Sequence, residues 1–448
     1  MELMPHQIAD ADFLAARKFA GCFNGMGTGK TLTALEAFLR ATADRLIIVG
    51  PPISLPMWKR EAERHTGLDA QILKSGTTKI GSVRILVMSY DIARRRVDEL
   101  MDWAMQDGGC ALICDESHAL KSTVAKRTKA ILGRGGLCTV MRHSWMLTGT
   151  PITRWSDDLI PFLFRAAPGD VRQNVGALSV DRFRLRYCIT KQKQYPGAWK
   201  PVTVVVGDRN LDELGSMLST CATRRTLDEV WEAMPPLTFT RLPVEPRATP
   251  ELREAKKAIA ERSAEKLAQG LRSAEEPLAP ILRVLGLSLV PEAAEFVYER
   301  IDSGAGPVLI GGWHKDVLGL MTSTLRAKKL RVEQLDGETP AAKKSELERM
   351  FNDGELDALV GQIGAMGVSL NLQRGGNNIV VIEEAWSPSV MDQFYARLHR
   401  MGQERPVHVD TLYIPTKLAD AIHAVSQNKR RSHATVAAAH QEGDHTNV

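Results

Sequence analysis

The sequence has few cysteines, no long apolar run and no recognisable leader. Six cysteines occur in 448 residues, and none of them forms a C-x-x-C pair. Neither a zinc site nor a disulfide framework is therefore indicated. No uninterrupted apolar run is long enough to span a membrane, and residues 1–5 lack the charged and apolar regions of a signal peptide. We expect a cytoplasmic protein that is neither exported nor embedded in a membrane.

The chain also lacks a strong excess of charge of either sign. Lys and Arg number 58 and Asp and Glu 53, which leaves a formal net charge of only +5. No overall basic field requires a nucleic-acid partner, so any such binding must be local. The length and the 44% hydrophobic content suit a globular protein of two to three domains.

Residues 23–31 have the composition of a loop that binds phosphate. Its small residues, whose backbone N–H groups can turn toward an anion, are Gly25, Gly27, Thr28 and Gly29. Lys30 would supply charge for the β- and γ-phosphates, and Thr31 a hydroxyl for Mg²⁺. A helical pattern follows directly, so the loop would end at a helix N-terminus. Asn24 departs from the strict G-x-x-x-x-G-K-[ST] pattern, and a glycine-rich turn with a surface lysine is the alternative.

Short apolar runs alternate with helical patterns in both halves of the chain. The predicted strands are residues 45–52, 83–90, 111–115 and 145–149 in the first half, and 306–311, 330–335, 356–360, 379–382 and 407–413 in the second. Strands of nearly continuous hydrophobicity favour a parallel sheet covered by helices on both faces, with ligands at the carboxyl ends of the strands. The fold class is therefore α/β, with two sheets.

The middle and the end of the chain have no such pattern. Residues 246–269 are rich in Ala, Glu, Lys and Arg, which predicts a charged, exposed helix that connects the two halves. From Ser426 onward we expect a disordered tail. Its basic triplet, residues 429–431, suits a solvated end better than a nucleic-acid contact or a targeting signal.

Asp115 and Glu116 follow a buried strand, at the edge where a ligand is expected. Asp115 could hold Mg²⁺ opposite Thr31, while Glu116 could orient and deprotonate the water that attacks the γ-phosphate. The alternative is an Asp-Glu pair that opens a helix and is stabilised by its dipole. The phosphate-binding loop earlier in the chain favours the catalytic interpretation.

Arg397 and Arg400 lie three residues apart near the end of the second half. On a helix they would share one face and could reach one polyphosphate together, as arginine fingers do. Arginine suits this role because its guanidinium is always charged and can bind in a bidentate manner. The alternative is a basic amphipathic helix on the surface.

These motifs, in this order, resemble those of the Swi/Snf-type helicase-like ATPases of superfamily two. In the first half the matching segments are residues 5–7, 26–31, 51–61, 115–118 and 147–152; they are followed by 222–230 and 234–236, by 335–339, by 367–372 and by 393–403. Residues 183–188 and 210–214 look most like the annealing-helicase branch, which rewinds or remodels forked DNA. Two features depart from the family: residues 361–364 lack the usual hydroxyl side chain, and Lys343 and Lys344 lie where arginine is common.

The resemblance implies two RecA-like P-loop lobes, each a mostly parallel sheet with helices on both faces, joined by a helical connector. The implied domains are an ATP-binding lobe over residues 1–240 with a helical insertion near 155–235, the connector 241–290, a helicase lobe over 291–425 and the tail 426–448. No zinc finger or other appendage is recognised, so the chain resembles a bare motor.

The resemblance also implies an ATPase that is stimulated by DNA and uses ATP and Mg²⁺. It would couple hydrolysis to movement on duplex or forked DNA in DNA repair or recombination, and would contact that DNA mainly through phosphates. Residues implied for the nucleotide are Gln7, Gly27, Thr28, Gly29, Lys30 and Thr31; for the metal, Thr31 and Asp115; for catalysis, Lys30, Asp115, Glu116, Arg397 and Arg400; for coupling, His118 and Gln393; for DNA, Ser54, Lys59, Thr148, Thr150 and Asn371.

Two other functions remain open from the sequence. The first is a strand-separating DNA or RNA helicase with the same ATPase core. The second is an ATP-dependent switch that clamps nucleic acid without moving along it.

Overall fold

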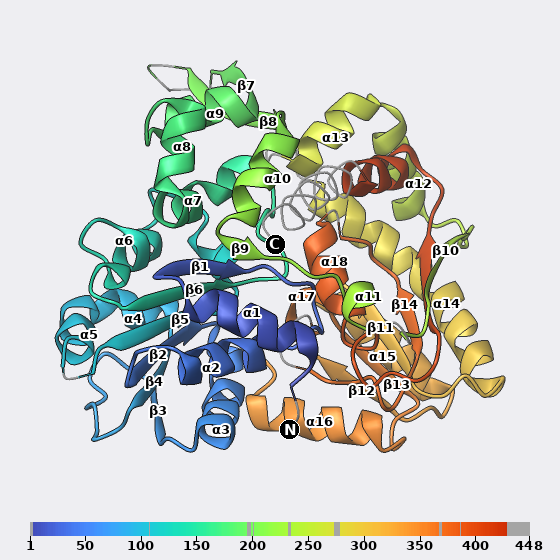
Figure 1. Cartoon of the computed structure of the whole chain (residues 1–448). Coiled ribbons are helices and arrows are strands. Elements are labelled where there is room, and N and C mark those ends of the chain that lie inside the picture. Colours follow the sequence, from blue (N-terminus) through green and yellow to red (C-terminus); the bar gives the residue numbers. More distant parts are fainter. Residues whose placement is uncertain are drawn as a thin grey trace. The chain divides into compact units, whose positions relative to one another are not determined.

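The computed structural model describes residues 3–106, 108–194, 199, 201–231, 234–272, 278–366, 370–385 and 387–427 (Figure 1). The described chain divides into two compact units, the first ending at Val230 and the second beginning at Trp231. The predicted boundary between the lobes, after residue 240, lies ten residues further along the chain. No helix in the described part is long and apolar enough to cross a membrane.

The first unit is built on a parallel sheet of seven strands. They are β1 (Phe19–Cys22), β2 (Arg45–Gly50), β3 (Ala70–Leu73), β4 (Ile85–Ser89), β5 (Cys110–Cys114), β6 (His143–Leu147) and β9 (Ala222–Thr223). The order across the sheet is β3-β4-β2-β5-β6-β1-β9, and all neighbouring pairs are parallel. The four predicted strands correspond to β2, β4, β5 and β6, whereas β1, β3 and β9 were not predicted.

Helices cover both faces of this sheet. The helices of the first unit are α1 (Pro5–Ala15), α2 (Lys30–Arg40), α3 (Leu55–Thr66), α4 (Tyr90–Arg95), α5 (Val97–Ala104), α6 (Lys126–Leu132), α7 (Ile160–Ala166), α8 (Pro168–Val175), α9 (Val180–Tyr187), α10 (Leu211–Ser219) and α11 (Leu227–Val230). Successive side chains of β2 alternate between two apolar clusters: Leu46 packs in the cluster that contains Trp58 of α3, and Ile47 in the cluster that contains Leu100 of α5. This alternation explains why the predicted strands are apolar at nearly every position.

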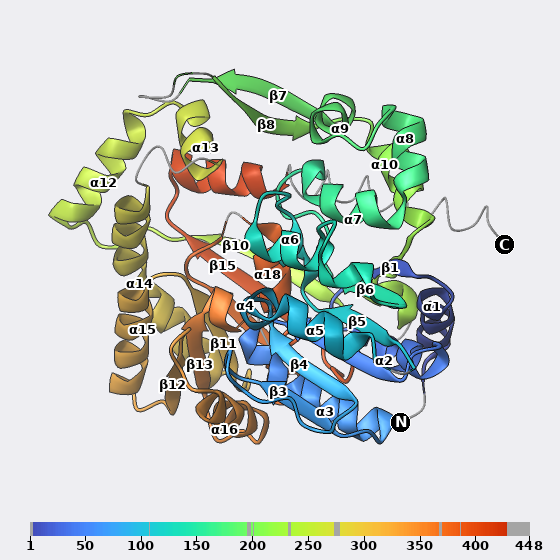
Figure 2. The same ribbon diagram turned by 90° about the vertical axis from the view of Figure 1, so that its left-hand side faces the viewer.

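The insertion predicted to be helical, residues 155–235, also contains a two-stranded antiparallel ribbon. Its strands are β7 (Cys188–Lys193) and β8 (Val202–Asp208). Figure 2 shows the ribbon beside α8, α9 and α10, with α7 between it and the seven-stranded sheet. Four of the six residues of β7 are exposed, so the ribbon has no apolar alternation by which the sequence could reveal it.

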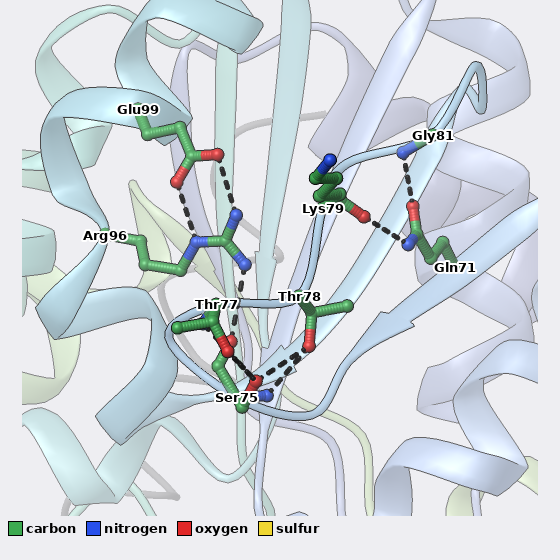
Figure 3. A network of polar contacts seen from close by, with 8 residues as sticks. All are labelled: Gln71, Ser75, Thr77, Thr78, Lys79, Gly81, Arg96 and Glu99. Atoms are coloured by element: carbon green, nitrogen blue, oxygen red, sulfur yellow. Dashed lines mark hydrogen bonds and ion pairs between the residues drawn. The ribbon is translucent and has the colours of Figure 1, made fainter.

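A polar network fixes the loop that follows β3 (Figure 3). Arg96 is buried, donates two hydrogen bonds to the carboxylate of Glu99 at 2.7 and 2.8 Å, and donates a third to the carbonyl of Ser75. At the other end of the loop, Gln71 accepts from Gly81 N–H and donates to the carbonyl of Lys79, both at 2.8 Å. The network holds the loop against helix α5 and strand β3.

The second unit is built on a parallel sheet of six strands. They are β10 (Leu237–Pro243), β11 (Val308–Gly312), β12 (Val332–Leu335), β13 (Ala358–Gln362), β14 (Asn378–Val381) and β15 (Val407–Tyr413), in the order β10-β15-β14-β11-β13-β12. All five strands predicted for the second half are present. β10 was not predicted and pairs with β15 at the edge of the sheet. The prediction of two mostly parallel α/β sheets is confirmed.

Helices again cover both faces. The helices of the second unit are α12 (Pro250–Ala260), α13 (Ala264–Arg272), α14 (Ala279–Asp302), α15 (Lys315–Ala327), α16 (Ala341–Asn352), α17 (Ile363–Met366), α18 (Pro388–Tyr395) and a last helix over residues 417–427. Val308 and Ile310 of β11 pack in the cluster of α14 and α15, and Leu309 in the cluster of α16 and α18. The segment predicted as one connecting helix, residues 246–269, forms α12 and part of α13. Most of the predicted tail, residues 428–448, lies outside the described residues.

Candidate functional site

The predicted phosphate-binding loop joins the carboxyl end of β1 to the first residue of α2. Gly27 and Gly29 have φ angles of 79° and 84°, in the left-handed region where glycine is favoured. Gly29 occupies the N-cap position, and no side chain caps the helix there. The first N–H groups of α2 are therefore directed at the loop, as an anion site requires.

The side chains of the loop fold inward. Lys30 Nζ donates to the carbonyls of Asn24 and Gly25 at 2.9 and 2.8 Å. The buried Thr28 hydroxyl donates to the carbonyl of Gly25 at 2.9 Å, and its own carbonyl lies 3.0 Å from His6 Nε2. Thr31 is partly exposed on the first turn of α2. The loop is thus organised around its own carbonyls, with Lys30 lying over them.

A buried hydrogen bond between Asp10 and Asn24 supports the start of this loop, and the sequence did not reveal it. Asn24 is fully buried and donates from Nδ2 to Asp10 Oδ2 at 2.6 Å, while its Oδ1 accepts from Thr223 Oγ1 at 3.3 Å. Arg225 Nε lies 3.5 Å from the other oxygen of Asp10. Burial raises the pKa of Asp10, and Asn24 and Arg225 oppose that rise. Asn24 is therefore a structural link between α1, the loop and β9.

Gln7 is also buried in α1. Its side-chain oxygen accepts from Met4 N–H at 2.9 Å, which closes the first turn of the helix. His6, one residue earlier, reaches the loop through Thr28. The residue predicted to contact adenine therefore lies on a helix that is fixed to the phosphate-binding loop.

Asp115 lies at the carboxyl end of β5 and is tightly held. Trp58 Nε1 donates to its Oδ2 at 2.7 Å, Glu116 N–H donates to its Oδ1 at 3.0 Å, and Tyr90 OH donates to its carbonyl at 2.7 Å. Burial raises the pKa of Asp115 to about 6, and the neighbouring Glu116 adds to that rise, while Trp58 and Lys30 oppose it. Lys30 thus favours the ionised form of this carboxylate.

Glu116 adopts a left-handed backbone conformation that is unusual for a residue with a side chain. Its φ and ψ angles are both 49°, a conformation that costs of order 1–2 kcal/mol for an L-residue. The next link in the site is His118, whose Nδ1 lies 3.2 Å from both Glu116 Oε2 and Thr148 Oγ1. His118 thus bridges the end of β5 and the end of β6.

The segment after β6 contacts the phosphate-binding loop. A Cβ atom added at Gly149 would lie 3.0 Å from Met26 Cγ and 3.5 Å from Lys30 Nζ. Thr150 N–H donates to Thr148 Oγ1 at 3.1 Å. The first unit therefore brings together the loop, Asp115, Glu116, His118 and Thr148, which lie far apart in the sequence.

The residues predicted to face DNA in the first unit have different degrees of exposure. Ser54 and Thr148 are only 3% and 2% exposed, and the Ser54 hydroxyl donates to the carbonyl of Pro51. Thr150 is partly exposed, and Lys59 is partly exposed and paired with Glu63. Lys59 is therefore better placed for a phosphate contact than Ser54 and Thr148, whereas the hydroxyl oxygen of Thr150 is buried.

The two arginines lie in the second unit but not on a helix. Helix α18 ends at Tyr395, so the prediction that Arg397 and Arg400 share a helix face is wrong. The turn after the helix nevertheless brings them together, since Arg397 Nη1 and Arg400 Nη1 both donate to the carbonyl of Leu370, at 3.0 and 3.5 Å. Burial lowers the pKa of Arg400.

Asn371 and Gln393 hold these arginines. Asn371 Oδ1 accepts from Arg400 Nη1, and the carbonyl of Gln393 accepts from Arg397 Nε at 2.9 Å. Residues 367–369, part of the segment 367–372 that resembles the family, lie outside the described residues. The structure thus brings together Arg397, Arg400, Asn371 and Gln393 in the second unit.

Comparison with known proteins gives two family matches. Residues 6–272, more than half of the chain, match the SNF2-related domain, and residues 294–402 match the helicase conserved C-terminal domain. The chain is 25% identical over 429 residues to the DNA annealing helicase and endonuclease ZRANB3 of Mus musculus, covering 92% of this chain and 38% of that protein. It is also 25% identical over 439 residues to the SWI/SNF-related matrix-associated actin-dependent regulator of chromatin subfamily A-like protein 1 of Xenopus tropicalis, covering 95% of this chain and 44% of that protein.

The chain thus spans about two fifths of the length of these relatives. Among solved structures, that of S. cerevisiae Dbp5 bound to RNA and ADP BeF3 resembles this chain with a TM-score of 0.53 at 11% identity, covering 96% of this chain and 88% of that one. A likeness at this identity concerns the fold. It agrees with two RecA-like lobes, as the sequence predicted.

Proposed function

The chain belongs to the SNF2-related family, and we propose that it is an ATP-dependent motor that moves along duplex or forked DNA. The names of its relatives support this proposal, since they include a DNA annealing helicase and a DNA repair and recombination protein. In the cell, such a motor would act on DNA during repair or recombination. The observation that carries the proposal is the assembly, at one edge of the first sheet, of the phosphate-binding loop with Asp115, Glu116 and His118.

The nucleotide would be held by the first unit. Backbone N–H groups of the loop and of the first turn of α2 would bind its phosphates, and Lys30 would leave the carbonyls of Asn24 and Gly25 for the β- and γ-phosphates. Gln7 would contact the adenine. The residues of the loop assigned to ATP are Gly27, Thr28, Gly29, Lys30 and Thr31.

Mg²⁺ fits the donors that this site offers. Thr31 supplies a hydroxyl and Asp115 a carboxylate, and both are the oxygen ligands that Mg²⁺ prefers while it keeps several waters. The bound ion would neutralise charge on the phosphates. The indole N–H of Trp58 donates to one carboxylate oxygen of Asp115 and so fixes the orientation of the carboxylate.

Glu116 would orient and deprotonate the attacking water. Its left-handed backbone places a carboxylate beside His118, and His118 contacts Thr148 in turn. A displacement of the residues at the end of β6 would therefore move His118 and, through it, Glu116. We assign His118 and the buried Thr148 to the coupling between this segment and hydrolysis. Ser54, also buried, would support the segment after β2 rather than touch DNA.

The second unit would supply positive charge during hydrolysis. Arg397 and Arg400 would stabilise the charge that develops on the transferring phosphoryl group, as arginine fingers do. Gln393 would position Arg397 through its carbonyl. Contact with DNA would come from Lys59, Thr150 and Asn371, which are suited to phosphates rather than to base edges, so no sequence specificity is expected.

The first experiment measures ATP hydrolysis with and without DNA. We expect duplex or forked DNA to raise the rate of the wild-type chain, and Lys30→Ala to abolish both the basal and the stimulated rates. Equal rates with and without DNA would contradict the proposal.

A second experiment separates movement from unwinding and from clamping. Displacement of a third strand from a triplex reports movement along duplex DNA, whereas release of a strand from a fork reports helicase activity. We expect ATP-dependent triplex displacement that Lys30→Ala abolishes. Fork unwinding without triplex displacement would favour a strand-separating helicase. If DNA-dependent activities survived in Lys30→Ala, an ATP-dependent switch would be favoured instead.

A further inference from the structure

The β7–β8 ribbon differs in composition from the rest of the chain. Between Ile189 and Gly207 the sequence contains three lysines and neither Asp nor Glu, although the whole chain has almost as many acidic as basic residues. The ribbon also carries exposed apolar side chains, since Ile189 is 48% and Val202 47% exposed. A basic surface that includes exposed apolar groups is typical of a binding site for a partner of negative charge.

The base of the ribbon is firmly anchored. The fully buried Ser156 donates from its N–H to Asp208 Oδ1 at 2.7 Å and from its hydroxyl to the carbonyl of Tyr187 at 3.0 Å. Arg209 N–H donates to the same carbonyl at 2.9 Å. An isolated pair of strands is marginally stable, so this anchoring explains how the ribbon holds its shape.

The two faces of the ribbon carry different chemistry. Lys191 lies opposite Val204 and Lys193 opposite Val202, so these four side chains share one face. On the other face Gln192 lies opposite Thr203 and donates to its hydroxyl at 3.0 Å. One face therefore combines positive charge with apolar surface, whereas the other carries Thr190, Gln192, Thr203 and Val205 and no charge.

Trp199 lies in the segment that joins the two strands, and it is fully exposed. Exposing an indole to water is unfavourable, and a partner that covers it would recover that free energy. Unpaired bases are such partners, because an aromatic side chain stacks on the face of any base. Lysines on the same ribbon would bind the adjoining phosphates.

We propose that the β7–β8 ribbon is a DNA-binding element, in which Lys191 and Lys193 bind phosphates and Trp199 stacks on an unpaired base at a junction. A two-stranded ribbon has a width that fits a DNA groove, so the lysine face can follow a duplex up to the point where it opens. The inference rests on the proposed function, and it adds a site that distinguishes a junction from plain duplex DNA.

The test measures binding of the full chain, without nucleotide, to three fluorescently labelled DNAs of equal length: a blunt duplex, a fork with unpaired arms and a single strand. In Trp199→Ala we expect affinity for the fork and the single strand to fall about tenfold, the loss of one stacked base, while affinity for the blunt duplex stays unchanged. Trp199→Phe should keep most of the affinity for the fork. Met105→Ala, which removes another exposed apolar side chain of the first unit, is the matched control.

The lysines are tested through salt dependence. In the double variant Lys191→Gln, Lys193→Gln we expect the slope of log affinity against log salt to become less steep by about 2 on all three DNAs, because about one counterion is released for each phosphate contact. The double variant Lys257→Gln, Lys266→Gln removes two exposed charges from α12 and α13 and should leave the slope unchanged.

Two outcomes would overturn the inference. One is wild-type affinity of Trp199→Ala for the fork, and the other is an equal loss on fork and blunt duplex. ATP hydrolysis at saturating blunt duplex should be unchanged in every ribbon variant. If duplex DNA fails to stimulate the wild-type chain at all, the proposed function is wrong, while the binding measurements still decide whether the ribbon binds DNA.

Discussion

The two units hold their candidate catalytic groups in different ways. In the first unit, Asp115 is fixed by Trp58 and Tyr90, and the loop is supported by the buried contact between Asp10 and Asn24. In the second unit, Arg397 and Arg400 converge on the carbonyl of Leu370, and Arg400 also donates to the side-chain oxygen of Asn371. The first arrangement fixes a carboxylate and a loop, and only Lys30 would have to leave the carbonyls of Asn24 and Gly25 when phosphates bind. The second occupies the arginines with acceptors of their own unit, so it suits groups that act only in part of the cycle.

This comparison makes its strongest prediction for Arg400. Arg400→Ala should lower kcat by about 10³-fold, the lower end of the effect of an arginine finger, while the affinity for ATP remains close to that of the wild type. The reason is that the nucleotide is held by the first unit. Single-turnover hydrolysis and equilibrium binding of a fluorescent ATP analogue measure the two quantities.

Arg400→Lys is the control for this prediction. It keeps the charge but loses the bidentate geometry, and we expect it to recover only part of the rate. If Arg400→Ala abolished ATP binding and left kcat unchanged, the division of labour between the units would be wrong.

Glu116→Gln should lower kcat by about 10²-fold to 10⁴-fold, because the water loses its general base. ATP binding should persist, since the phosphates and the metal are held by other groups. Binding and turnover measured on the same preparation check this. Glu116→Gly, which also relieves the left-handed backbone, should be equally inactive but more stable by about 1 kcal/mol. A stability equal to that of the wild type would argue against strain at this position.

Asn24 tests the framework of the first unit. Asn24→Gly restores the strict pattern of the loop but leaves the buried Asp10 without its hydrogen bond, which should cost about 2 kcal/mol. For a unit of this size that is a fall of about 5 °C in the midpoint of thermal unfolding. The exchange variant, Asp10→Asn with Asn24→Asp, reforms the hydrogen bond with the charge moved and should recover most of the loss. A stabilised Asn24→Gly variant would show that Asn24 merely replaces glycine.

The same pair predicts a dependence on pH. Burial raises the pKa of Asp10, and the hydrogen bond from Asn24 favours the ionised form and opposes that rise. In Asn24→Gly the pKa of Asp10 should rise further. The variant therefore loses more stability than the wild type as the pH increases through the pKa values of Asp10 in the two folded chains. The difference in thermal midpoint should be full above the pKa of Asp10 in the folded variant, the higher of the two, and should shrink as the pH falls to the pKa of Asp10 in the folded wild type, below which Asp10 is protonated in both folded chains.

Whether a strand could be predicted from the sequence depended on how completely its side chains are buried. Strands such as β2, β4 and β5 are apolar at nearly every position because helices cover both faces, and the sequence located them. β1 consists of Phe, Ala, Gly and Cys, and β10 contains an arginine and a proline, so neither has a strand pattern. The β7–β8 ribbon was missed because its side chains are mostly exposed.

The candidate site shows a similar division. Lys30, Asp115 and Glu116 could be proposed from the sequence, because their spacing reflects local geometry at the ends of strands. The links that hold them could not be proposed, since Asn24 and Thr223 are 199 residues apart and Trp58 reaches Asp115 across 57 residues. The helix face assumed for Arg397 and Arg400 was wrong because α18 ends one turn too early. The convergence of the two arginines depends on Leu370, from a different segment.

The smallest expected effect concerns Asn371, which holds Arg400 through its side-chain oxygen. Asn371→Ala removes this acceptor and leaves Arg400 with the longer contact to the carbonyl of Leu370. If the hydrogen bond to Asn371 keeps Arg400 away from the nucleotide, the loss of that hydrogen bond should raise the DNA-independent ATPase rate about fivefold. This is the equivalent of one hydrogen bond of about 1 kcal/mol. Asn371→Asp, which strengthens the acceptor, should lower the same rate. An unchanged basal rate with weaker DNA affinity in Asn371→Ala would assign Asn371 to DNA contact alone. The contacts of Arg400 within the second unit would then not restrain its action on the nucleotide, and this difference between the two units would disappear.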